Sequence, residues 1–314
     1  TTTDCAVVKQ GRPAVNADGA LIGGWRTMVE AVDVRTVGLG GDSRVSFSRD
    51  ARLLVGPRKV MPLSLLAQQA PAALLDLRQL VTAQQLPIQA THYAFRNPGP
   101  EAPAHLAALE RRLWAALTTT PQRLSKLVHS RPSTQALWRL ADAGLATVAA
   151  FTPSDAMHVL GRQQGWSVEA AQLGAQLLTI EERNMKGISG TATVPELCER
   201  VVEHVIRESA RVVLATALAH DPGIEARASS WGMLGDRLIA DVVAGRPFAA
   251  LVQAGLRVAT PLVAIGAPAQ SYYPEVARRL GSTLSIPPHA AVCNAVGAVA
   301  GVVSQTVELL VNQP

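Results

Sequence analysis

Two segments near the start of the chain carry residue types that suit phosphate binding. Residues 1–4 read Thr-Thr-Thr-Asp, and hydroxyls with backbone N–H groups on a turn between strands can hold a phosphate. The Asp4 carboxylate could hold Mg²⁺, usually through water. Residues 38–43 read Gly-Leu-Gly-Gly-Asp-Ser, and the glycines let the backbone approach a ligand closely. Each segment also has a plainer interpretation, a frayed terminus for the first and a turn between strands for the second.

A third segment of this kind lies far along the chain. Residues 266–269 read Gly-Ala-Pro-Ala and follow the apolar run 262–265. A turn of small residues at the carboxyl end of a strand is where open α/β sheets bind ligands. The segment lacks both common phosphate motifs, the G-x-G-x-x-G run and the Lys-containing P-loop, so a simple strand-to-helix connection is the alternative.

The elements that must position these segments are strands at both ends of the chain and helices between them. Runs of Val and Thr favour strands, and apolar residues at helical spacing favour helices. We predict strands over 4–9, 32–37, 44–48, 52–55, 261–265 and 283–286. We predict helices over 63–80, 106–117, 121–129, 134–143, 194–220, 273–280 and 290–310, and one that starts at Pro153 after an N-cap at Thr152. The strands of the two ends should lie side by side, and the Ala-, Gly- and Val-rich helix 290–310 should be packed on all sides.

This order of elements predicts an α/β fold in two parts. The economical arrangement is one α/β core, built from residues 1–60 and 190–314, that is interrupted by a helical insertion over 61–189. Three short helices and an extended piece make residues 100–150 of the insertion resemble a winged-helix module.

The third helix of this module decides whether it could read DNA. Gln135 and Arg139 are its only long hydrogen-bonding side chains, whereas base readout usually needs three or four. We therefore expect a structural module without specific DNA affinity.

Composition narrows the function classes further. Of the 314 residues, 48% are hydrophobic and 17% charged, which excludes intrinsic disorder. Three cysteines without metal-ligand spacing exclude a disulfide scaffold and lead us to expect a cytoplasmic protein. The net charge of +5 is scattered, which argues against nucleic acid as a partner. The longest uncharged stretch, 289–307, contains Asn, Ser and Gln, so we expect no membrane span.

The three segments together resemble the hydantoinase A / 5-oxoprolinase family, which belongs to the actin-like ATPases with two ribonuclease-H-like halves and nucleotide between them. Residues 1–8 are similar to the tail of its Gly-Gly-Thr-(Ser/Thr)-Thr-Asp phosphate turn, which opens the second half. Residues 36–43 are similar to its Thr-(Ile/Val)-Gly-x-Gly-Gly-x-Ser segment, with Asp where Gly is common. Further similarities are at 152–161, at the adenosine turn 266–269, at Ile286-Pro287 and at 294–298.

The resemblance implies a set of site residues. Phosphate binding falls to Thr1, Thr2, Thr3, Gly40, Gly41, Asp42 and Ser43. Nucleotide binding falls to Gly266, Ala267, Pro268, Asn294 and Gly297, and Asp4 becomes the catalytic residue and the holder of Mg²⁺. The implied fold is a ribonuclease-H-like half with a winged-helix-like insertion. The implied activity of the whole protein is ATP-dependent hydrolysis of cyclic amides of the hydantoin or 5-oxoproline type, with ATP and Mg²⁺ as cofactors.

One departure from the family matters most. Its first half, with a phosphate turn of its own, is not in this chain, so we expect a fragment or subunit that works with an N-terminal ATPase half or a second subunit. By itself the chain should bind ATP weakly or not at all, because most of the contacts are absent. The alternatives are a nucleotide-sensing regulatory protein of actin-like fold, and an N-terminal-nucleophile hydrolase that uses Thr1.

Overall fold

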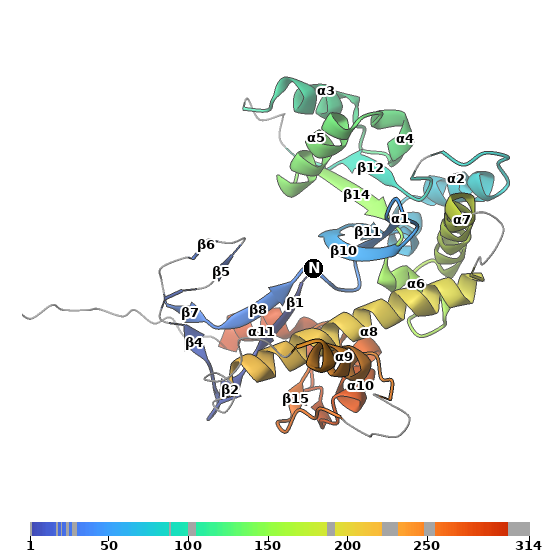
Figure 1. Cartoon of the computed structure of the whole chain (residues 1–314). Coiled ribbons are helices and arrows are strands. Elements are labelled where there is room, and N and C mark those ends of the chain that lie inside the picture. The colour runs from blue at the N-terminus through green and yellow to red at the C-terminus, as the bar shows by residue number, and fades with distance from the viewer. Residues whose placement is uncertain are drawn as a thin grey trace, which may run out of the picture.

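The chain is a mixed α/β protein whose small sheets are joined and covered by helices (Figure 1). The computed structural model describes residues 2–16, 18–19, 21–22, 25–26, 30–87, 89–99, 105–186, 192–221, 232–247 and 255–300. The helices are α1 (Leu63–Gln69), α2 (Pro71–Val81), α3 (Ala108–Ala116), α4 (Leu124–Leu127), α5 (Arg131–Asp142), α6 (Pro153–Val159), α7 (Val168–Lys186), α8 (Val194–Ala219), α9 (Gly232–Val243), α10 (Ala269–Arg279) and α11 (Cys293–Ala300). The strands are β1 (Thr3–Ala6), β2 (Val8–Lys9), β3 (Arg12–Pro13), β4 (Val15–Asn16), β5 (Leu21–Ile22), β6 (Trp25–Arg26), β7 (Ala31–Val32), β8 (Val34–Val37), β9 (Ser43–Phe47), β10 (Leu53–Lys59), β11 (Met61–Pro62), β12 (Tyr93–Arg96), β13 (Gln122–Arg123), β14 (Ala146–Ala150), β15 (Leu262–Val263) and β16 (Leu284–Ser285).

Several predicted elements are confirmed at their expected positions. Strands β9 and β10 form the antiparallel hairpin, with Val45 opposite Val55. Helix α6 starts at Pro153, and the Thr152 side chain caps it by accepting a hydrogen bond from the backbone N–H of Asp155. Helix α8 begins at Val194 as predicted and runs for 26 residues.

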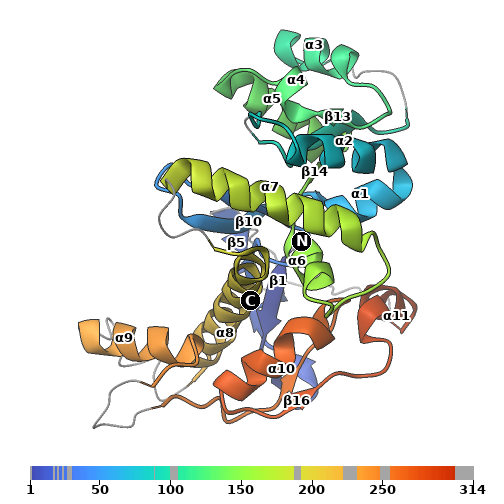
Figure 2. The ribbon, with the colours of Figure 1, turned by 90° about the vertical axis from the view of Figure 1, so that its right-hand side faces the viewer.

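The prediction that strands from both chain ends share one sheet is wrong. Strand β1 pairs antiparallel with β8, and β15 pairs in parallel with β16, but these are two separate sheets. The long helix α8 explains the separation, because it contacts β1 and β8 and also packs against α10. Figure 2 shows α8 running past β1 toward α9 and α10.

Two helix predictions also need correction. The predicted helix 121–129 is in fact the short strand β13 followed by one turn of helix, α4, because residues 122–123 pair with β12. The predicted helix 290–310 is described only as far as residue 300. Over α11 it is exposed and not packed on all sides: Val299 is 89% exposed and no residue of the helix is buried. The rest of that prediction lies outside the described residues.

The region predicted to resemble a winged helix has a core of its own. Strands β11, β14, β12 and β13 form a four-stranded sheet in that order, and α3, α4 and α5 lie beyond it at the top of Figure 1. Side chains of these helices and of β12 and β14 make a separate buried cluster around Leu137 and Trp138. We call residues 93–150 the module. The winged-helix comparison remains a prediction.

The main core joins the two parts of the predicted division. Buried side chains of α1, α2, α6 and α7 pack in one cluster with those of α8 and α10. Glu182, on α7, lies within this core: its side chain is fully buried and pairs with Lys186 and Arg200. The domain boundaries stay a prediction.

A membrane span would need a longer and more apolar helix than any in the described part of the chain.

Candidate functional site

A cleft of about 940 Å³ brings together two of the three predicted segments. Gly41 and Asp42 line one part of it, and Ala267 and Pro268 line it from more than 200 residues along the chain. Its other lining residues come from the hairpin, from β11 and α1 after it, from α6 and the loop after it, and from the module: Pro57, Arg58, Lys59, Val60, Met61, Pro62, Leu65, Asn97, Trp138, Ala141, Asp142, Gly144, Ala146, Thr147, Val148, Ser154, Gln163 and Trp166. A cleft of this size, largely apolar and with a few polar groups, is of the kind that holds a small ligand.

The glycine-rich loop 38–43 is held tightly against α6. Ser43 closes the loop, since its hydroxyl accepts a hydrogen bond of 2.9 Å from the Gly40 N–H while its own N–H donates to the Gly40 carbonyl. The carbonyl of Gly41 accepts a 2.8 Å hydrogen bond from the Ser154 N–H. A Cβ on Gly41 would lie only 2.8 Å from the Ser154 Oγ, so this close approach requires glycine.

Asp42 presents an unsatisfied carboxylate oxygen next to the cleft. Its Oδ1 is buried and has no hydrogen-bond partner among the described residues, and its Oδ2 lies 3.6 Å from the Lys59 Nζ. A buried acceptor without a partner is costly. The Asp42 carboxylate is therefore placed to accept a donor or a cation that a ligand brings.

The threonine-rich start of the chain reaches the same loop from β1. Thr3 is buried, and its hydroxyl donates a 3.0 Å hydrogen bond to the Leu39 carbonyl. The exposed Asp4 carboxylate accepts hydrogen bonds from the hydroxyls of Thr2, at 2.6 Å, and Thr36, at 2.7 Å, and it does not line the cleft. Thr1 lies outside the described residues.

The predicted nucleotide residues divide into two groups. Ala267 and Pro268 lie immediately before α10 and line the cleft, next to Gly266, whose N–H donates to the Ala290 carbonyl. Asn294 and Gly297 lie on the exposed helix α11 and do not line it.

Several residues of the cleft were missed by the sequence reasoning. Ser154 belongs to the Thr-Pro-Ser-Asp run at the start of α6, which indicated a helix N-terminus and a family similarity over 152–161 but gave Ser154 no role at the site. Trp166 lines the cleft and stacks on His158, with ring centroids 5.3 Å apart. Trp138 and Lys59 carry no motif at all, because only the fold brings the module and the hairpin together.

Asp155 joins the first turns of two helices beneath the cleft. Its buried carboxylate accepts hydrogen bonds from the N–H groups of Leu63 and Ser64 at the start of α1, from the Ser64 hydroxyl, and from the N–H and hydroxyl of Thr152. Burial raises the pKa of Asp155, while these five donors oppose that effect. The contacts fix the position of Ser154, the neighbour of Asp155 in sequence.

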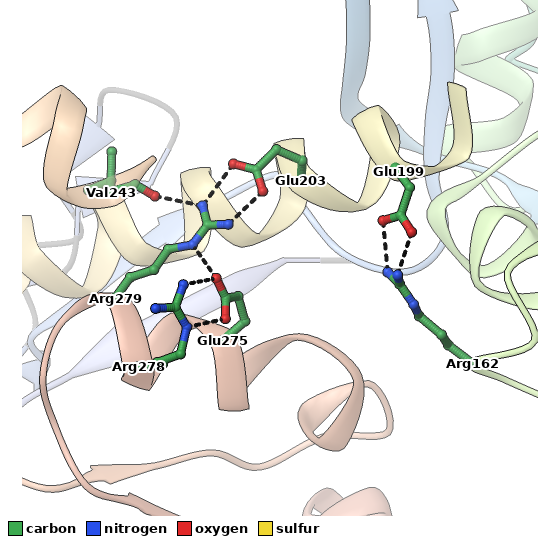
Figure 3. A network of polar contacts seen from close by, with 7 residues as sticks. All are labelled: Arg162, Glu199, Glu203, Val243, Glu275, Arg278 and Arg279. Atoms are coloured by element: carbon green, nitrogen blue, oxygen red, sulfur yellow. Dashed lines mark hydrogen bonds and ion pairs between the residues drawn. The ribbon is translucent and has the colours of Figure 1, made fainter. Parts of the chain in front are cut away.

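Helix α8 holds two walls of the cleft through ion pairs that Figure 3 draws. Glu199 pairs with Arg162, which lies next to the cleft residue Gln163. One turn later, Glu203 pairs with Arg279 at the end of α10, at 2.6 Å. Arg279 is 7% exposed, and it also donates to Glu275 and to the Val243 carbonyl. These pairs set α10, and with it the turn at Pro268, against α8.

The acidic residues allow only a simple metal site. Among the described residues, no three His, Cys, Asp or Glu side chains gather in a way that could hold a metal ion. Mg²⁺, however, is commonly held by one or two carboxylates together with water and substrate phosphates. The unsatisfied oxygen of Asp42 fits that requirement.

Comparison with known proteins gives one match. A family model described as Hydantoinase/oxoprolinase matches residues 1–71, a stretch that includes both the threonine-rich start and the glycine-rich loop. No curated protein and no solved structure matches the chain.

Proposed function

We propose that the chain, whose residues 1–71 match the Hydantoinase/oxoprolinase family model, is a fragment or subunit of an ATP-dependent hydrolase of cyclic amides in that family. The observation that carries the proposal is the cleft where the loop at Gly41 and Asp42 meets the turn at Ala267 and Pro268. These are the segments that the family resemblance relates to phosphate and to adenosine. We propose further that the fold is a ribonuclease-H-like half of an actin-like ATPase.

The residues at the cleft have distinct roles in this proposal. The backbone of Gly41, which lines the cleft, approaches the phosphates, and Gly40 shapes the loop through its hydrogen bonds with Ser43. The Ser154 hydroxyl, beside Gly41, is placed to donate to the same phosphates. The small residues Ala267 and Pro268 leave room for the flat adenine base.

Mg²⁺ would be held by Asp42, whose Oδ1 has no other partner among the described residues. When bound, it would neutralise charge on the phosphates. Asp4 remains a candidate for a second carboxylate, since Thr3 joins its strand to the glycine-rich loop through Leu39. The hydroxyls of Thr2 and Thr36 hold the Asp4 carboxylate in one orientation.

The proposed reaction couples two bond cleavages. The amide oxygen of the ring takes the γ-phosphoryl group of ATP, and ADP leaves. Water then adds to the activated carbon, the ring C–N bond breaks, and phosphate is released. Positioning and charge neutralisation supply most of the catalysis in phosphoryl transfer, which is why a shaped cleft with backbone donors suits this chemistry.

This chain should form only one side of the nucleotide site. We propose that the N-terminal ATPase half or a second subunit supplies the other side. The chain alone should therefore bind Mg-ATP with a dissociation constant well above the micromolar range. Calorimetric titration would test this, and micromolar affinity would indicate a complete one-domain ATPase.

Photolabelling with 8-azido-ATP tests where the nucleotide lies. Millimolar Mg-8-azido-ATP should label a peptide that contains residues 266–269, and excess ATP should prevent the labelling. Asp42→Asn should reduce the labelling several-fold, whereas Asp50→Asn, in the exposed turn of the same hairpin, should leave it unchanged. Labelling at the smaller pocket of about 590 Å³ between β8 and α8, or no labelling that ATP competes with, would overturn the proposal.

The hydrolase part of the proposal is tested by stoichiometry. At millimolar Mg-ATP, the chain together with its partner half should release one ADP for each hydantoin or 5-oxoproline ring that opens. Ring opening without ATP would contradict the coupling.

A further inference from the structure

Trp138 stands where the module meets the β9–β10 hairpin, and two guanidinium groups lie over its ring. The Cζ of Arg44 is 5.6 Å from the ring centroid and the Cζ of Arg58 is 5.1 Å from it. The register of the hairpin places Ser43 opposite Lys59, so Arg44 and Arg58 are near neighbours on it. Trp138 and Arg58 both line the cleft, at its module side, whereas Arg44 is not a lining residue and adjoins the cleft through the ring of Trp138.

The two arginines differ in their charge partners. Arg58 donates two hydrogen bonds, of 2.7 and 2.8 Å, to the carboxylate of Asp142, which lies one helical turn after Trp138 on α5. Arg44 has no carboxylate partner among the described residues, and its Nε is buried without a hydrogen bond. Asp142 therefore balances one of the two positive charges.

The surroundings of Arg44 make its unbalanced charge costly. Burial, together with the positive charge of Arg58, lowers the pKa of Arg44, but a guanidinium in a protein stays charged. The nearby His92 is fully buried and neutral, since burial and the charge of Arg44 lower its pKa to about 3. Among the described residues, no carboxylate pairs with Arg44 to supply the negative charge that a desolvated guanidinium requires.

We propose that Arg44 and Arg58 form an anion subsite at the module side of the cleft, where they bind an acidic group, a carboxylate or a phosphate, of the ligand that the cleft takes. The proposal rests on the proposed function in one respect, namely that the cleft binds a ligand. The indole of Trp138 holds the two guanidiniums in place. In the absence of ligand, Asp142 forms an ion pair with Arg58. Both side chains are about half exposed, so this ion pair is weak.

The opposing interpretation is a structural clamp that only fastens the module to the hairpin. The two interpretations predict different effects of Asp142→Asn on the affinity for anions. In a clamp, Asp142 is a useful partner and its loss changes no ligand affinity. In an anion subsite, it competes with the ligand for Arg58, so its removal should strengthen anion binding.

A pair of probes that differ by one charge tests the subsite. The full chain is titrated by calorimetry at low salt with 5-oxoproline, with its uncharged analogue 5-oxoprolinamide, and with inorganic phosphate. At least one of the two anions, 5-oxoproline or phosphate, should bind. If 5-oxoproline binds, it should bind about tenfold more tightly than 5-oxoprolinamide. Phosphate binding alone would identify a phosphate as the acidic group of the ligand. Added salt should weaken the binding of either anion.

Matched variants locate the effect. Arg44→Gln and Arg58→Gln should each weaken anion binding about tenfold, and Asp142→Asn should strengthen it several-fold. The control is Arg96→Gln, because Arg96 lies over the ring of Trp114, at 4.5 Å in the same module, and not over Trp138. It should bind the anions like the unmodified chain.

Three outcomes would overturn the subsite: no binding of either anion, equal affinity for the acid and the amide with no binding of phosphate, or the same affinities in Arg44→Gln and Arg96→Gln. None of these would change the site of 8-azido-ATP labelling, so failure of the subsite is distinguishable from failure of the proposed function.

Discussion

The Ser154 N–H donates a 2.8 Å hydrogen bond to the Gly41 carbonyl, and the Ser154 Oγ lies only 2.8 Å from the position that a Cβ on Gly41 would take. This contact joins the glycine-rich loop to the first turn of α6 across more than 100 residues. It therefore determines the shape of the cleft at the point where we place the phosphates.

Gly41→Ala should destabilise the fold by about 1–3 kcal/mol, since the new methyl group is forced against Ser154. The loss should be smaller in a Ser154→Ala background, where the Oγ is gone. Gly297→Ala is the control, because a Cβ there meets nothing within 4 Å and the residue is on an exposed helix. It should be neutral or stabilising by about 0.5–1 kcal/mol. Urea unfolding of the unmodified chain, the three single variants and the Gly41→Ala/Ser154→Ala double variant measures these losses, and an equal loss with and without the Ser154 hydroxyl would contradict the contact.

The buried His92 should make the fold sensitive to acid. Its folded pKa of about 3 lies below its ordinary value of 6.5, so the unfolded chain takes up a proton first as the pH falls. Stability is therefore fully present above pH 6.5 and is lost between 6.5 and about 3, by roughly 1 kcal/mol per pH unit. Chemical unfolding of the unmodified chain and of His92→Gln should show curves that converge as the pH falls through this window. Parallel curves would show that His92 does not titrate as stated.

The two glutamates of α8 in Figure 3 should differ in their contribution to stability. Glu203→Gln leaves Arg279, which is 7% exposed, with one carboxylate fewer and should cost about 1–3 kcal/mol. Glu199→Gln breaks a pair that is about half exposed and should cost about 0–1 kcal/mol. Thermal unfolding of both variants at low and high salt tests this. Equal shifts in the two variants would mean that burial of Arg279 does not matter.

The module should not bind DNA in a sequence-selective way. Arg139, one of three long hydrogen-bonding side chains on α5 with Arg131 and Gln135, pairs with Glu110 of α3. Trp138 and Asp142 contact the hairpin. Too few free side chains remain for base readout. A gel-shift assay at low salt with random and genomic duplexes should show no selective complex. Selective binding that Arg139→Ala abolishes would favour the regulatory alternative.

Local signals in the sequence predicted the local structure well. The N-cap at Thr152 and the two hairpin strands appear where the pattern placed them, since each depends on a few neighbouring residues. The predicted relation between the distant strands was wrong, because nothing in β1 or β15 indicates that β1 pairs with β8 beside α8 while β15 pairs only with β16. Helix α11 was misjudged for a similar reason: an Ala- and Val-rich composition indicates burial but does not reveal what covers it.

The residues of the candidate site also fall into those that the sequence could reveal and those that it could not. The glycine-rich loop and the small-residue turn could be found from residue types alone, and the structure places both at one cleft. Trp138 and Arg44 could not be found in this way. They matter because they join the module to the hairpin, and the two residues lie about 90 positions apart in the sequence.

Chemical-shift mapping of the isotope-labelled chain during titration with Mg-ATP tests the central claim most directly. We expect weak binding, with dissociation constants near the millimolar range, and shifts confined to residues 38–43, 154 and 266–269. Asp42→Asn should reduce these shifts, and Asp50→Asn should not. Shifts that are absent at 10 mM Mg-ATP, or that fall instead around Arg35 and Arg211, would contradict a nucleotide site in this cleft.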